Sequence, residues 1–300
     1  MTAIRGPRRV LLPLAAAALL VVPLGAPLPA GAHGEAAGLA HVTLIGDSVA
    51  TAIPGDTDAI RVLRMGSDLD LDVAPCRRLV DQSCPPNPPT VIEVIKRLGA
   101  AVGPTVVIAV GYNDFEDHYA SEIDDTLAAL DAASVKRIFW LTMRAAHHPY
   151  INMNDEINAA AANRSNMSVI DWNVYSRSHP EWFQADGIHL LSPGSRAMAG
   201  LIHDKLVAAG VAAQPVHVKT TALPTSRRLH PYRSSLAAAG GVGPYTWSLT
   251  GRLPAGLHLR SSGVISGAPR ATKRGVYTVV VRVKDAIGQT DTRKLLLRLR

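Results

Sequence analysis

The sequence is poor in aromatic residues, in charge and in cysteine. Of its 300 residues, 5% are aromatic, 18% are charged and two are cysteine, whereas 47% are apolar. Two cysteines are too few for a small fold packed around disulfides, and this composition excludes collagen-like repeats and a largely disordered chain. A chain of this length buries a sizeable core without covalent staples. The composition therefore indicates a globular protein of about two domains.

Long apolar runs are missing beyond the first thirty residues. No later run approaches the roughly 20 residues that cross a bilayer, so we do not expect several membrane spans. Residues 1–32 have a basic start with three arginines, an apolar stretch over residues 10–24 and a small-residue end at residues 30–32. This layout predicts a secretory signal peptide cleaved after Ala32 and a secreted or cell-surface protein. A retained membrane anchor is the alternative, but four prolines disfavour a continuous spanning helix.

Export determines how the two cysteines, Cys76 and Cys84, are interpreted. Seven residues separate them, and in an oxidising compartment we expect them to form one local disulfide. A metal site would need more ligands than this pair offers, and we expect no metal.

Charge divides the chain in two. Residues 33–215 hold 13 basic and 22 acidic residues, a net charge of −9, whereas residues 216–300 hold 15 basic and 2 acidic residues, a net charge of +13. The change falls in a stretch with glycine and proline where helical patterning ends. We therefore predict domains over residues 33–213 and 214–300.

The amino-terminal domain alternates strand and helix patterns. The run over residues 105–110 is continuously apolar and rich in β-branched residues, which is typical of a parallel strand buried on both faces. Further strands are predicted over residues 41–45, 69–73, 137–142 and 168–171, and helices over residues 49–63 with an interruption at Pro54 and Gly55, 90–98, 121–133, 152–163 and 193–209. This order predicts a doubly wound, flavodoxin-like α/β/α sandwich, with its chemistry at the carboxyl ends of the strands.

The carboxy-terminal domain has turn signals instead of a helical period. Short strands are predicted over residues 245–249, 257–259, 276–283 and 294–299, which suggests a small β-sandwich. The phrases PYTWSL, LPAGL, GVISGAP, GVY and VKD occur in this order between residues 244 and 285 and resemble the Ig-like modules appended to bacterial secreted enzymes. Trp247 is expected in the core of this module.

Three short motifs supply candidate catalytic groups. Gly46-Asp47-Ser48 follows the first predicted strand, and Gly111-Tyr112-Asn113-Asp114 follows the strand over residues 105–110. In the third motif, Asp186 and His189 are three residues apart, so the carboxylate can reach one imidazole nitrogen and leave the other to face a nucleophile. Each motif has a plain alternative, such as Ser48 capping a helix or Asn113 capping a turn.

Together these motifs resemble the blocks of the GDSL/SGNH hydrolase superfamily of serine esterases. The resemblance runs over residues 41–206 and implies a triad of Ser48, His189 and Asp186, with oxyanion-hole donors from the backbone N–H of Ser48 and the amide of Asn113. The glycine block departs from the pattern. Cys76 occupies the corresponding strand-to-loop position and has the backbone N–H that the family uses there, whereas Gly66 is a weaker candidate because it precedes its strand.

The resemblance implies a secreted carboxylester hydrolase that works through an acyl-enzyme on Ser48 and needs no cofactor. Its substrate would be a small acyl ester, a lipid or an acylated glycan. Two alternatives stay open. One is an acyltransferase or deacetylase that acts on cell-envelope glycans, because hydrolysis and transfer share the acyl-enzyme. The other is a non-catalytic protein that binds anionic envelope polymers through its basic domain. A nucleic-acid partner is not expected of an exported chain with few aromatic residues.

Other pairs of residues have structural interpretations. We expect the adjacent His147 and His148 in a surface loop, and Asp171 and His179 apart in structural roles. Arg77 and Arg78 are expected to pair with Asp72 and Asp81, and the alternative is that they hold an anionic substrate group. Trp182 and Phe183 fit the wall of an acyl pocket or the core equally well.

Overall fold

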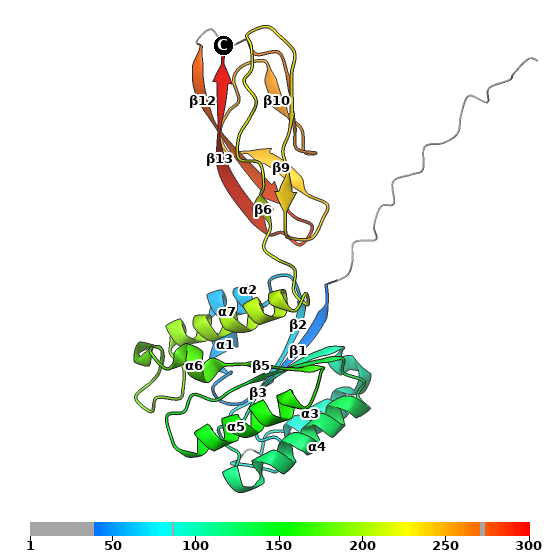
Figure 1. Ribbon diagram of the computed structural model, residues 1–300, viewed down its shortest axis with the longest axis vertical. Coiled ribbons are helices and arrows are strands. Elements are labelled where there is room, and N and C mark those ends of the chain that lie inside the picture. Colours follow the sequence, from blue (N-terminus) through cyan, green and yellow to red (C-terminus); the bar gives the residue numbers. More distant parts are fainter. Residues whose placement is uncertain (1–38, 86, 271–273) are drawn as a thin grey trace, which may run out of the picture. The chain divides into compact units, whose positions relative to one another are not determined.

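The computed structural model describes residues 39–85, 87–270 and 274–300, so the expected signal peptide over residues 1–32 lies outside the described residues. Within these ranges an α/β domain is followed along the chain by an all-β domain (Figure 1). No helix in the described ranges is long and apolar enough to cross a membrane.

The α/β domain is built on five parallel strands. They are β1 (His41–Gly46), β2 (Asp68–Val73), β3 (Thr105–Ala109), β4 (Arg137–Leu141) and β5 (Met167–Ile170), in the order β2-β1-β3-β4-β5. The direction of winding reverses between β1 and β3. In doubly wound sheets the crevice at such a switch point, outside the carboxyl ends of the strands, holds the binding site.

Helices cover both faces of this sheet (Figure 1). Phe139 and Leu141 of β4 pack in one core and Ile138 and Trp140 in the other, because alternate side chains of a strand face opposite sides. The first core is closed by α1 (Ala52–Gly55), α2 (Thr57–Leu63), α6 (Trp172–Ser176) and α7 (Ser192–Ala208), and the second by α3 (Val91–Leu98), α4 (Tyr119–Ala132) and α5 (Pro149–Ala162). Short 3₁₀ helices lie at Gly99–Val102, Glu116–His118 and Pro180–Trp182. The predicted α/β/α sandwich is confirmed.

The interruption predicted at Pro54 and Gly55 is present one residue later, and it separates α1 from α2. The break lies at Asp56, whose Oδ1 accepts hydrogen bonds of 3.0 Å from the backbone N–H groups of Asp58 and Ala59. A carboxylate in this position caps the first turn of α2 and favours a new helix start.

The all-β domain consists of short antiparallel sheets around one core. Its strands are β6 (His217–Val218), β7 (Tyr232–Ser235), β8 (Ala238–Ala239), β9 (Thr246–Leu249), β10 (Leu257–Leu259), β11 (Val264–Gly267), β12 (Gly275–Lys284) and β13 (Thr290–Leu299). They pair in the orders β10-β11-β7, β13-β12-β9 and β6-β8. Trp247 is 6% exposed, which confirms its expected place in the core. The predicted small β-sandwich is confirmed.

Candidate active site

Ser48 lies in the turn that follows β1. Gly46 ends the strand with no room for a side chain, because a Cβ would lie 2.4 Å from the Cβ of Ala50. The helix α1 begins at Ala52 with Thr51 at its N-cap, so Ser48 is not a helix cap. Its side chain is half-buried and free to make a tertiary contact.

That contact is a hydrogen-bonded row of three side chains. The Oγ of Ser48 lies 3.0 Å from Nε2 of His189, and Nδ1 of the same imidazole lies 2.6 Å from Oδ2 of Asp186. Ser48 and His189 are 141 residues apart in the sequence, and the fold brings them together at the carboxyl edge of the sheet. This is the order of groups that activates a serine hydroxyl for nucleophilic attack.

The turn at residues 186–189 orients the carboxylate. Oδ1 of Asp186 accepts hydrogen bonds from the N–H groups of Ile188 at 2.9 Å and His189 at 3.0 Å, which leaves Oδ2 for the imidazole. The hydrogen bond with the His189 side chain, helped by these N–H groups, lowers the pKa of Asp186 to about 2. Asp186 is therefore ionised at neutral pH and stabilises a positive charge on His189.

Asp47 joins the first two motifs and was not predicted to have a role. Its fully buried carboxylate accepts hydrogen bonds from the N–H groups of Val49 at 3.0 Å and of Gly111 and Tyr112 at 3.2 Å. Burial raises the pKa of Asp47 to about 6 against the effect of these donors. The Ser48 turn and the turn after β3 are therefore held together by one side chain.

Gly111 leaves no space for a larger residue at the start of the turn after β3. A Cβ at this position would lie 2.5 Å from Sδ of Met143 and 2.7 Å from the hydroxyl oxygen of Tyr119. The close packing allows the backbone of residues 111–113 to pass beside the Ser48 turn. Steric crowding thus explains why this motif has glycine at position 111.

Asn113 reaches across to the loop that follows β2. Its Nδ2 donates a hydrogen bond of 3.2 Å to the carbonyl oxygen of Arg77, so its side chain does not cap its own turn. The amide nitrogen carries a second hydrogen, available to another acceptor. Asn113 and Cys76 therefore lie on neighbouring loops at the carboxyl edge, and their oxyanion roles stay predictions.

Cys76 has a backbone conformation that glycine usually adopts. Its φ is 63°, in the left-handed region that side chains disfavour. Cys76 follows β2 at the same edge of the sheet as Ser48, whereas Gly66 precedes β2 and lies at the opposite edge because β1 and β2 are parallel. The geometry thus favours Cys76 over Gly66 as the residue in the glycine position.

The Cys76 loop is fixed by covalent and ionic contacts. Cys76 and Cys84 form the expected disulfide. Nη2 of Arg77 lies 2.6 Å from Oδ1 of Asp72, and Nη2 of Arg78 lies 3.6 Å from Oδ2 of Asp81, so both predicted pairings are confirmed. The buried Arg77 also donates from Nη1 to the carbonyl oxygen of Gly46 at 3.3 Å and from Nε to that of Pro89 at 2.9 Å. It ties the start of the Ser48 turn to the neighbouring loop.

Arg144 is a second residue without a sequence signal. Its Nη1 donates a hydrogen bond of 2.7 Å to the carbonyl oxygen of Gly187, and its guanidinium lies 4.3 Å from the ring centroid of Phe183. Its backbone N–H donates to the hydroxyl of Tyr112 at 2.7 Å. Arg144, in the segment that follows β4, therefore supports the Asp186–His189 turn. Phe183 is 5% exposed and belongs to the core, with Trp182 packed against it.

The remaining candidate pairs do not form sites. Oδ1 of Asp171 accepts from the N–H of Val174 at 2.9 Å and caps α6, whereas His179 pairs with Glu181 at 2.8 Å. His147 and His148 are exposed. Among the described residues, no three His, Cys, Asp or Glu side chains are close enough to hold a metal ion.

Sequence comparison finds different relatives for the two domains. The family described as Putative Ig domain matches residues 213–299. The O-acetyltransferase OatA of Staphylococcus aureus is 35% identical over 104 residues, which are 34% of this chain and 16% of that protein. The putative peptidoglycan O-acetyltransferase YrhL of Bacillus subtilis is 25% identical over 157 residues, or 50% of this chain and 24% of that protein. The chain thus spans about a sixth to a quarter of these relatives.

Three observations point to the same type of domain: the sequence similarity, the order of the motif blocks, and the hydrogen-bonded contact of Ser48, His189 and Asp186. The chain carries an SGNH-type domain followed by an Ig-like domain. Solved structures similar to the SGNH-type domain include the catalytic domain of peptidoglycan O-acetyltransferase A from Streptococcus pneumoniae, with a TM-score of 0.47 and 20% identity over 58% of this chain and 96% of that chain. A carbohydrate esterase of family 3 from Talaromyces cellulolyticus has a TM-score of 0.41 and 15% identity over 57% and 98%.

The sequence relatives of the SGNH-type domain are described as O-acetyltransferases. The triad is open to solvent, since the side chains of His189 and Asp186 are 42% and 45% exposed. The imidazole and the carboxylate are therefore accessible from solvent, and Ser48 is half-buried beside them.

Proposed function

We propose that this chain is an exported serine enzyme that removes acyl groups, above all acetyl groups, from esters of cell-envelope glycans. The observation that carries the proposal is the row from Ser48 Oγ through the His189 imidazole to Asp186 Oδ2, with separations of 3.0 and 2.6 Å. The similarity to O-acetyltransferases, one of them described as acting on peptidoglycan, favours an acetyl ester of a glycan over a lipid ester.

The reaction begins when Ser48 Oγ attacks the ester carbonyl carbon and His189 Nε2 takes the hydroxyl proton. A bond forms between Oγ and the carbonyl carbon. The bond to the alcohol oxygen then breaks, and His189 gives its proton to the departing alcohol. Asp186 holds the imidazole and stabilises its positive charge meanwhile.

The carbonyl oxygen gains negative charge in this step. We assign its stabilisation to the backbone N–H groups of Ser48 and Cys76 and to the second hydrogen of the Asn113 amide. Loss of one such donor costs ~2.7–4 kcal/mol of transition-state stabilisation. Water, activated by His189, then attacks the acyl-enzyme and releases the acid and free Ser48.

The second candidate function is transfer of the acetyl group to a sugar hydroxyl. The named activity of the relatives favours it, and the acceptor would replace water in the last step. Product analysis distinguishes the two: with an acetyl donor and a glycan acceptor, hydrolysis yields acetate alone, whereas transfer yields an acetylated glycan.

Labelling with a fluorophosphonate probe tests the catalytic assignment directly. We expect the protein to be labelled and to hydrolyse short aryl acetates. Ser48→Ala should abolish both, and His189→Ala should lower both at least a hundredfold. Persistent labelling of the Ser48→Ala variant would contradict the assignment of the nucleophile.

We also propose that residues 1–32 direct export, that residues 33–213 form the catalytic domain and that the basic domain of residues 214–300 holds the enzyme near anionic envelope polymers. The net charge of +13 over residues 216–300 supports the last assignment.

A further inference from the structure

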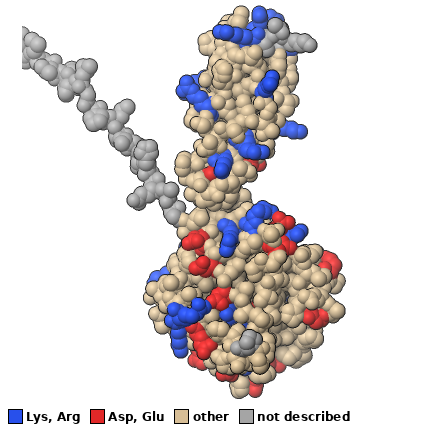
Figure 2. Space-filling model, turned by 180° about the vertical axis from the view of Figure 1, so that it is seen from behind, with Lys and Arg blue, Asp and Glu red and all other residues tan. Residues whose placement is uncertain are grey.

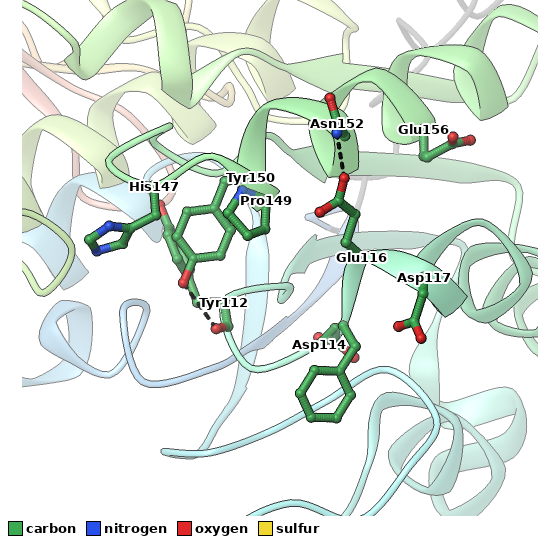
Figure 3. Close-up of a pocket in the computed structure, with 10 residues that line it drawn as sticks. Tyr112, Asp114, Glu116, Asp117, His147, Pro149, Tyr150, Asn152 and Glu156 are labelled. Atoms are coloured by element: carbon green, nitrogen blue, oxygen red, sulfur yellow. Dashed lines mark hydrogen bonds between the residues drawn. The ribbon is translucent and has the colours of Figure 1, made fainter.

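A pocket of about 940 Å³ lies beside Tyr112 and Asp114, in the turn after β3 (Figure 3). It is formed by the segment after β3, by the residues that precede α5 and by the first turns of α5. Ser48, Asp186 and His189 do not line it. Its lining consists of Tyr112, Asp114, Phe115, Glu116, Asp117, His147, Pro149, Tyr150, Asn152 and Glu156.

The charges that line the pocket are all negative at neutral pH. Its negative charge comes from Glu116, Asp117 and Glu156, and no lysine or arginine lines the pocket. The fourth carboxyl group, Asp114, stays protonated because burial raises its pKa to about 8. Figure 3 shows the carboxylates of Glu116, Asp117 and Glu156 on one side and the rings of Tyr112, Tyr150 and His147 on the other. Glu116 accepts a hydrogen bond from Asn152, whereas Glu156 is exposed on α5. A negatively charged pocket attracts cations and repels phosphate and carboxylate groups.

The aromatic side chains give the pocket apolar faces. Tyr150 lies edge to face with Tyr112, with ring centroids 5.0 Å apart, and its hydroxyl donates to the Tyr112 carbonyl oxygen at 3.3 Å. Phe115 is 60% exposed, and the guanidinium of Arg78 lies 4.6 Å from its ring centroid. Arg78 is itself paired with Glu122 at 3.1 Å. The exposed ring of Phe115 and the partly exposed ring of Tyr150 therefore offer apolar surface on which a ligand ring can stack.

These features do not suit a bare metal ion. The described residues contain no cluster of three potential metal ligands, so the carboxylates are too far apart to share one ion. Carboxylates on one side of the pocket and aromatic rings on the other suit a larger organic ligand that has both hydroxyl groups and a positive charge. A volume of about 940 Å³ fits such a ligand, because small-molecule sites span roughly 300–1,000 Å³.

We propose that this pocket binds an amino sugar, a pyranose unit with a protonated free amine, within the glycan on which the enzyme acts. The sugar ring packs on Tyr150 and Phe115, and the ammonium group is placed near Glu156. The pocket is connected to the catalytic turn through Tyr112, whose N–H donates to Asp47 beside Ser48. The identity of the substrate as a glycan rests on the proposed function, but binding in the pocket does not require catalysis.

The test measures binding to the Ser48→Ala variant of the mature chain, which cannot turn over a substrate. Glucosamine oligomers and N-acetylglucosamine oligomers of equal length are titrated at mildly acidic pH, where the free amine is protonated. We expect the glucosamine oligomers to bind at least about fivefold more tightly, because acetylation removes the charge. Equal affinity for the two, or no binding of either, would overturn the proposal.

Two further variants locate the binding. Glu156→Gln is expected to weaken glucosamine binding about threefold, and Phe115→Ala by a similar factor. The matched control is Asp155→Asn, the neighbouring exposed residue of α5 that does not line the pocket, and it should leave the affinity unchanged. An equal loss in the Asp155→Asn control would show a general charge effect and overturn the proposed site.

Aryl acetate hydrolysis by the unsubstituted chain separates this proposal from the proposed function. If hydrolysis is present and Glu156-dependent binding is absent, the pocket assignment fails alone. If binding is present and both hydrolysis and probe labelling are absent, the catalytic assignment fails alone. Glu156→Gln and Phe115→Ala should keep aryl acetate hydrolysis within about twofold, since neither residue touches the triad.

Discussion

Asp186 is the residue whose charge the proposed mechanism most needs. Its pKa of about 2 follows mainly from the hydrogen bond with His189, so the carboxylate stays charged at every pH where the imidazole works as a base. Asp186→Asn keeps the shape of the side chain and removes this charge, and it also permits the wrong imidazole tautomer. We expect kcat for aryl acetates to fall by roughly 10⁴ with little change in KM.

The lowered pKa of Asp186 also predicts how the stability of the protein changes in acid. Because the folded pKa of Asp186 is lowered from its ordinary value of 3.8, its stabilising contribution is present above that value and is lost as the pH falls towards about 2. The free energy of unfolding, measured by urea titration across this range, should fall more steeply in the wild type than in Asp186→Asn. Parallel curves would show that the carboxylate is not stabilised in the folded state.

At the scale of secondary-structure elements, the sequence predicted most of the α/β domain. The predicted strands start and end within one residue of β1 to β5, because β-branched runs and alternating patterns report burial directly. The short helix α6 was missed, since five residues give no helical period. Ser48, Asp186 and His189 were assigned because each lies in a recognisable motif.

Two supporting contacts of the site could not be predicted from the sequence. Arg77 donates to Gly46, 31 residues earlier, and Arg144 donates to Gly187, 43 residues later. Neither arginine lies in a motif with its partner, so only the folded arrangement shows the contact. The pocket beside Tyr112 was missed for the same reason, because it joins the segment after β3 to α5.

The loop after β2 offers a test of the Cys76 assignment. A double variant, Cys76→Gly with Cys84→Ser, removes the disulfide, whose closure of a short loop contributes roughly 2–3 kcal/mol, and relieves the positive φ of residue 76. The backbone N–H of residue 76 is retained. We expect the free energy of unfolding to decrease by roughly 1–2 kcal/mol and kcat for aryl acetates to stay within about threefold.

The matched control replaces Cys76 with valine in the same Cys84→Ser background. A β-branched side chain is strained at a φ of 63° and displaces the backbone N–H. We expect kcat to fall at least tenfold below that of the glycine variant, because one oxyanion donor is misplaced. Equal kcat values for the two double variants would contradict an oxyanion role for residue 76.

The contact between the Asn113 turn and α4 contains a buried carboxyl pair. Asp114 is 7% exposed, and burial beside Glu122 raises its pKa to about 8, although Leu79 N–H donates to it and Arg78 lies nearby. A pKa raised above the ordinary 3.8 means that the folded state binds an extra proton between these values. The free energy of unfolding should therefore fall as the pH rises through this range.

Asp114→Asn removes this titration and keeps an oxygen that can accept from Leu79. The expected result is a flatter pH dependence of the free energy of unfolding between about pH 5 and 7, by at most ~1.4 kcal/mol per pH unit for one proton. Urea titrations of both proteins at several pH values measure this slope. An unchanged slope would show that Asp114 is already ionised in the folded state.

At the scale of the whole molecule, the two domains differ in charge. Figure 2 shows Lys and Arg side chains over the visible face of the all-β domain with few acidic ones, whereas both signs occur on the α/β domain. On β12 and β13 the buried side chains are apolar and the outward positions include Arg282, Lys284, Lys294 and Arg298. One sheet of the Ig-like domain therefore has a basic outer face.

From this basic face we predict that the full mature chain binds an anionic polymer such as polyphosphate. Changing Arg282, Lys284, Lys294 and Arg298 to glutamine should weaken binding about tenfold at low salt and reduce its salt dependence, because fewer counterions are exchanged. Lys136→Gln with Lys205→Gln, two exposed lysines of the α/β domain, is the control and should change neither. Binding is measured by co-sedimentation over a salt series, and aryl acetate hydrolysis by the same variants should be unchanged, because the polymer contacts and the Ser48 site lie in different domains. Salt-independent binding would contradict electrostatic attachment and leave the Ig-like domain to recognise its partner by shape.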